Sequence, residues 1–62
     1  MNKIPRFVKE YANYQKKCIK ENSFMGEDVK ATSYNVIEKS ILNLERGLIT
    51  VRECMEIIAK QY

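Results

Sequence analysis

The chain has 62 residues, of which 45% are hydrophobic and 31% charged, with a formal net charge of +3 and no histidine. This composition excludes a disordered or membrane-embedded chain, and the length limits the protein to one small domain with a thin core. The absence of histidine excludes the usual general base, any histidine-containing catalytic triad and every Cys/His zinc site.

The first predicted element is a long amphipathic helix over residues 5–22. Pro5 suits its opening turn, because the missing N–H group would have no partner there. Apolar side chains at intervals of four, three and four residues predict the face that packs in the core. These side chains are Phe7, Tyr11, Tyr14 and Cys18, with Ile4, Val8 and Gln15 beside them on the same arc.

The opposite face of this helix is basic and is a candidate face for an anionic partner. Residues 1–20 carry a net charge of +5, from six bases and one acid, whereas residues 21–62 carry −2, from five bases and seven acids. Such an asymmetry is compatible with contact with an anionic partner. The candidate residues are Lys3, Arg6, Lys9, Lys16, Lys17 and Lys20. A solvated face of an ordinary soluble helix is the alternative, and we favour it.

Residues 22–32 are predicted to connect the first helix to the second. They contain Gly26 and an adjacent acidic pair, Glu27 and Asp28. A short helical turn that begins at Asp28 is the alternative for part of this segment.

The second helix is predicted over residues 33–46. Thr32 or Ser33 can accept an amide hydrogen bond as N-cap, and Gly47 suits the left-handed position just beyond the last turn. Its apolar residues alternate by three and four positions, which predicts a narrow packing seam. The seam consists of Tyr34, Ile37, Ile41, Leu44 and Leu48.

The third helix, predicted over residues 51–60, has the strongest start signal in the sequence. Thr50 and Glu53 form a T-x-x-E capping box. The G-x-I-T turn before it is so short that the second and third helices should be antiparallel or steeply crossed neighbours. The stretch ERGLITVRECMEII, about 14 residues, resembles the tight hairpin of the SHOCT (short C-terminal domain) type. This resemblance implies the hairpin and transfers no function.

The sequence therefore predicts an all-α fold, a small three-helix domain over residues 1–62 in which a long N-terminal helix packs on a C-terminal helical hairpin. Cys18 and Cys54 lie among apolar residues. We expect two buried free thiols, because nothing indicates an oxidising compartment, and a disulfide between them is the alternative. No apolar run approaches the roughly 20 residues of a membrane span, and the N-terminus lacks a signal-peptide core, so we expect a cytoplasmic protein.

The sequence contains no pattern typical of catalysis or of cofactor binding. Its eight carboxylates are scattered, and the one adjacent pair lacks the spacing of a calcium loop. Glycine-rich phosphate-binding motifs are also missing. We therefore expect a protein that is not an enzyme and that holds no metal and no cofactor.

Two further interpretations are disfavoured. A helix-turn-helix would place the outward face of the third helix against phosphate, and that face carries as many acids as bases. Its charged residues are Arg52, Glu53, Glu56 and Lys60. A membrane-surface role for the first helix ranks lowest, because the core is expected to occupy its apolar face.

Four apolar residues beside the predicted seams form a candidate oligomer or partner interface. They are Ile19, Val36, Leu42 and Ile57. A thin core favours self-association, so we expect a homodimer. The leading hypothesis is a small binding protein that occupies the surface of another macromolecule, a protein rather than a nucleic acid. In size and make-up it is similar to accessory or inhibitor proteins of phages and mobile elements. The alternative is a nucleic-acid-associated protein that uses the basic face.

Overall fold

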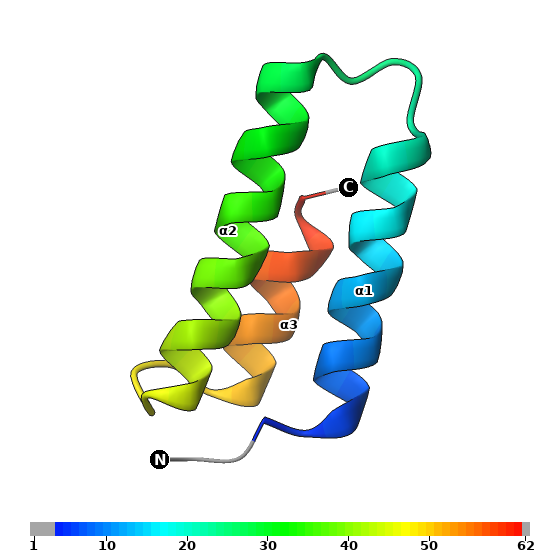
Figure 1. The fold of residues 1–62 in the computed structure, drawn as a ribbon. Coiled ribbons are helices and arrows are strands. Elements are labelled where there is room, and N and C mark those ends of the chain that lie inside the picture. Colours follow the sequence, from blue (N-terminus) through cyan, green and yellow to red (C-terminus); the bar gives the residue numbers. More distant parts are fainter. Residues whose placement is uncertain (1–3, 62) are drawn as a thin grey trace.

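The computed structural model describes residues 4–61, which form three α-helices and no strand (Figure 1). Helix α1 spans Arg6–Glu21, α2 spans Glu27–Glu45 and α3 spans Val51–Ala59. Helices α1 and α2 run antiparallel, and α3 lies against both of them (Figure 1). The predicted all-α three-helix fold is therefore confirmed.

Helix α3 is the shortest element, with nine residues against 16 in α1 and 19 in α2. It covers the end of the α1–α2 pair near the α2–α3 turn, so only two helices meet at the opposite end (Figure 1). All three helices contribute to the buried apolar core. Its members are Val8, Ala12, Ile19, Ile37, Leu44, Cys54 and Ile58.

The predicted start of the second helix is wrong, because α2 begins at Glu27 rather than near Ser33. Gly26 is its N-cap, and Glu27 and Asp28 lie in the first turn, where carboxylates favour the positive end of the helix dipole. Nothing in the following residues interrupts a helix. Thr32 is inside the helix, and its hydroxyl donates to the Asp28 carbonyl at 2.9 Å instead of capping.

The α2–α3 turn follows the local sequence signals. Gly47 adopts a positive φ of 76°, the left-handed conformation that a helix C-terminus often needs. The Thr50 Oγ1 accepts the Glu53 N–H at 3.1 Å, and the Glu53 carboxylate accepts the Thr50 N–H at 3.1 Å. The predicted capping box is thus confirmed. Leu48, the last member of the predicted seam, is 69% exposed and contributes nothing to the core.

Helix α1 buries Val8 and Gln15 of the predicted apolar arc, but its core face is rotated away from the centre of that arc. Its buried residues are Val8, Ala12, Gln15 and Ile19. They repeat at the same intervals as the predicted face, one residue later, which rotates the helix by about 100°. Ala12 is 1% exposed, and the amide of Gln15 donates to the Ile58 carbonyl on α3 at 3.3 Å. A polar side chain is therefore accommodated in the core because its hydrogen bond is satisfied.

Both cysteines are free thiols in the structure. Cys54 is buried, and its sulfur lies 3.7 Å from the hydroxyl oxygen of Ser40 on α2. Cys18 is only partly buried, because it belongs to the face of α1 that the rotation turns out of the core.

Candidate interaction surfaces

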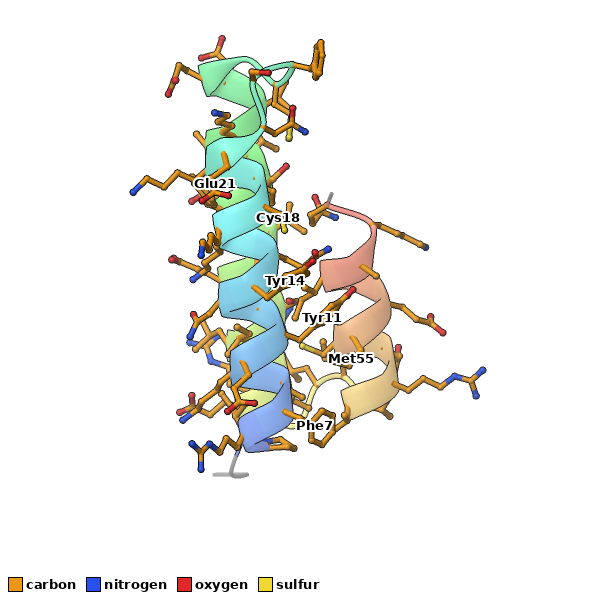
Figure 2. The ribbon with its side chains drawn as sticks, turned by 90° about the vertical axis from the view of Figure 1, so that its right-hand side faces the viewer. Phe7, Tyr11, Tyr14, Cys18, Glu21 and Met55 are labelled. Carbon is orange, nitrogen blue, oxygen red and sulfur yellow. The ribbon has the colours of Figure 1, made fainter. Side chains whose placement is uncertain are left out.

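The rotation of α1 leaves an apolar surface on the outside of the molecule, which we call the aromatic strip. It consists of Phe7, Tyr11, Tyr14 and Cys18 on α1 and Met55 on α3 (Figure 2). Figure 2 shows the four α1 side chains one above another along the edge of α1 that adjoins α3.

The aromatic strip is exposed at its outer side and anchored at its inner side. Phe7 is 56% exposed and Tyr14 is 62% exposed. Tyr11 and Met55 are partly buried and pack against the core. The core thus holds one side of the strip in place while large apolar groups on the other side remain in water.

A row of charged residues runs along α1 beside the aromatic strip. Its members in chain order are Arg6, Glu10, Lys17 and Glu21, all exposed. Arg6 Nε lies 3.1 Å from Glu10 Oε1, with side chains 92% and 65% exposed. An ion pair in this much water contributes little to folding, so these charges are available to another molecule.

The four residues predicted as an interface do not share one surface. Ile19 is fully buried and belongs to the core, so the prediction that it lies at an interface is wrong. Val36 and Ile57 are partly buried on either side of a shallow hollow of about 150 Å³ between α2 and α3. Leu42 is 43% exposed, and it lies about 120° around α2 from Val36.

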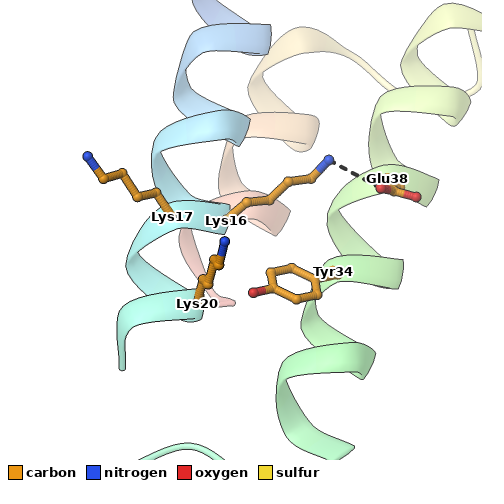
Figure 3. A pocket seen from close by; sticks show the side chains of 5 residues that line it. All are labelled: Lys16, Lys17, Lys20, Tyr34 and Glu38. Atoms are coloured by element: carbon orange, nitrogen blue, oxygen red, sulfur yellow. Dashed lines mark hydrogen bonds and ion pairs between the residues drawn. The ribbon is translucent and has the colours of Figure 1, made fainter. Parts of the chain in front are cut away.

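The basic residues of α1 are partly neutralised by carboxylates. Arg6 is paired with Glu10, as described above. Lys16 crosses to α2, where its Nζ lies 3.3 Å from Glu38 Oε1 (Figure 3). The side chains of Lys9, Lys17 and Lys20 are exposed and make no ion pair among the described residues. Lys3, the sixth candidate, lies outside the described residues.

An open hollow of about 610 Å³ lies between α1 and α2 on this basic side (Figure 3). It is lined by Lys16, Lys17, Lys20, Tyr34 and Glu38. Figure 3 shows the Tyr34 ring extending from α2 toward Lys20 on α1. Three cations beside an aromatic ring suit an anionic group. The carboxylate of Glu38 also lines the hollow, however, and it already pairs with Lys16.

Among residues 4–61, no three cysteine or acidic side chains gather where they could hold a metal ion. Within the same range, none of the helices has the length and apolar character needed to cross a membrane.

Comparisons with protein-family models, with curated proteins and with solved structures find no match for this chain. The short likeness of residues 45–58 to the SHOCT hairpin therefore assigns no family.

Proposed function

We propose that this chain is a small, cytoplasmic, non-enzymatic binding protein that acts through protein–protein contacts of the aromatic strip. In type it is comparable to the accessory or inhibitor proteins of phages and mobile elements. The observation that carries the proposal is the exposure of Phe7 and Tyr14 beside a core that already buries the other apolar stripe of α1.

The composition of the aromatic strip supports a protein partner. Aromatic residues and methionine are enriched at the centres of protein interfaces, where they supply most of the binding free energy. Tyrosine is well suited to such a place, because its ring is apolar while its hydroxyl can bond at the wet rim. Isolated exposed apolar side chains need no explanation, but Phe7 and Tyr14 adjoin the partly buried Tyr11 and Met55, and a continuous apolar surface of this kind favours a contact with another molecule.

Site-specific photo-crosslinking in the cells that make the protein tests this proposal. A benzophenone amino acid in place of Phe7 should give a defined covalent adduct with a polypeptide. The same group in place of Lys9, which is exposed on another side of α1, serves as the control. Purified adduct partner should bind the wild type and lose affinity for the Tyr14→Lys variant. Absence of an adduct, or equal yields from both positions, would contradict the proposal.

The second candidate function is nucleic-acid binding by the basic side of α1, favoured by the three lysines that line the hollow with Tyr34. Fluorescence anisotropy over a salt series tests it. Changing Lys9, Lys17 and Lys20 to Gln removes three exposed cations and should lower the slope of log affinity against log salt by about 2.7 for duplex DNA or about 2 for single strands. A wild type that shows no salt-dependent binding to either nucleic acid rejects this candidate.

A further inference from the structure

We propose that the aromatic strip binds the same strip of a second copy of this chain, with the two α1 helices antiparallel around a two-fold axis near Asn13. The proposal rests on the proposed function, because it names the partner of the same surface. Two-fold pairing of one surface with itself is the commonest way in which small soluble proteins assemble.

The apolar residues of α1 are arranged so that reversing the helix brings each onto a suitable partner. Their positions are symmetric about a point between residues 12 and 13. Phe7 would face the partner's Cys18, and Tyr11 would face the partner's Tyr14. A large ring then meets a small side chain at each end, while two tyrosine pairs fill the centre. The spacing of four, three and four residues is that of a coiled-coil seam, in which such interlocking is usual.

The charged row beside the strip is also symmetric, about a point between residues 13 and 14, which is one residue, or about 1.5 Å along the helix, from the centre of the strip. Along α1 the signs read plus, minus, plus, minus, from Arg6 through Glu10 and Lys17 to Glu21. In an antiparallel pair, Glu10 faces the partner's Lys17 and Arg6 faces the partner's Glu21, so every contact joins opposite charges. A parallel two-fold pair would place the two charged rows on opposite sides of the contact, so none of these pairs of opposite charge would form. The charges therefore select the antiparallel arrangement.

Helix α3 would flank this contact in each copy. Met55 lies beside Tyr11 on the side of the strip nearest α3 (Figure 2). The partner's α1 would therefore cover Met55 as well as the α1 helix of the same copy. This arrangement adds apolar burial to a 62-residue chain whose own core contains only seven buried apolar residues among those described, and self-association is a common remedy for such a thin core.

Charge reversal combined with sedimentation equilibrium tests the pairing. Glu10→Lys and Lys17→Glu each turn two attractive contacts of the dimer into two repulsive ones, so each single variant should dimerise at least about tenfold more weakly than wild type. An equimolar mixture of the two variants should restore association, because each chain then meets opposite charges on the other. Lys9→Glu changes the net charge by the same amount as Lys17→Glu on another side of α1, and it should behave as wild type.

A disulfide trap provides a readout of orientation that does not depend on charge. Under a mild oxidant, the Phe7→Cys variant should form covalent dimers through the partner's Cys18. Wild type should not, because the two Cys18 residues of the antiparallel pair are about 16 Å apart along the helix axis, beyond the reach of a disulfide. Lys9→Cys is the matched control and should remain monomeric on denaturing gels.

Three results would overturn the pairing: a wild type that is monomeric at the highest soluble concentration, single charge variants that dimerise like wild type, or a mixture no stronger than its components. Circular dichroism of each variant verifies the fold. A monomeric wild type that still gives a Phe7 photo-adduct with another polypeptide overturns the self-pairing alone. Loss of both the dimer and every photo-adduct overturns the proposed function as well.

Discussion

The rotation of α1 predicts that two neighbouring apolar stripes of the same helix differ strongly in their contribution to stability. Ile19 is fully buried, and truncating such a residue to alanine costs about 2–5 kcal/mol through lost burial and the cavity left behind. Phe7 is 56% exposed, so less than half of its side chain leaves water on folding. Full burial of a phenylalanine contributes about 1.5–3 kcal/mol, which leaves about 1 kcal/mol for Phe7→Ala.

Urea unfolding followed by far-UV circular dichroism measures this difference. The total stability expected for a chain of this length is only about 3–9 kcal/mol, so Ile19→Ala should remove a large share of it, and Ile19→Val is the milder substitute if that variant does not fold. Both variants should be measured at a protein concentration low enough to dissociate a dimer. Dimerisation through the aromatic strip would otherwise add to the stability of the folded protein. A Phe7→Ala variant that loses as much stability as Ile19→Ala would refute the assignment of the two faces.

Three other substitutions test separate parts of the structure. Thr50→Ala removes the acceptor that caps α3 and should cost about 1 kcal/mol, seen as a lower melting temperature, whereas an unchanged melt would contradict the capping box. Gln15→Met should lower the free energy of unfolding in urea by only about 0.5–1.5 kcal/mol. The loss is small because the Ile58 carbonyl still accepts the N–H of Gln61 at 3.1 Å after the amide is removed. Leu42→Glu should leave sedimentation unchanged, since Leu42 is far from the aromatic strip; weaker association would place the interface on α2 instead.

The parts of the fold that the sequence predicts well are those encoded by neighbouring residues. The capping box of Thr50 and Glu53 and the glycine at position 47 act within a few residues, so their effect does not depend on how the helices pack. Accordingly, the predicted helix over residues 51–60 begins where α3 begins and ends one residue after α3 ends.

The start of α2 was mispredicted because two local signals compete there. Thr32 and Ser33 are favourable N-caps, but an acidic pair that follows a glycine also begins a helix well. The structure uses the earlier start, although the added turn is almost wholly exposed, with Val29 at 53%. The Nζ of Lys30 in this turn donates to the Lys20 carbonyl on α1 at 2.9 Å, a contact between helices that a local pattern does not contain.

The aromatic strip was recognised as a pattern in the sequence but was predicted to pack in the core. Helix α1 carries two stripes with identical spacing, one residue apart, and the aromatic one is the more hydrophobic. The stripe that enters the core contains the small Ala12 and the polar Gln15, and Gln15 is accommodated there by a hydrogen bond to α3. Contacts between distant segments, such as Lys16 with Glu38, likewise become visible only in the folded chain.

The central claim is that the aromatic strip of one copy lies antiparallel on the strip of another. An isotope-filtered NOE experiment on a mixture of labelled and unlabelled chains at high concentration tests it most directly, because it records only contacts between copies. The predicted result is a set of cross-peaks from the Phe7 ring to the β-protons of the partner's Cys18 and from the Tyr11 ring to the partner's Tyr14. Intermolecular cross-peaks confined to Val36, Leu42 or Ile57, or none at all, would contradict the claim.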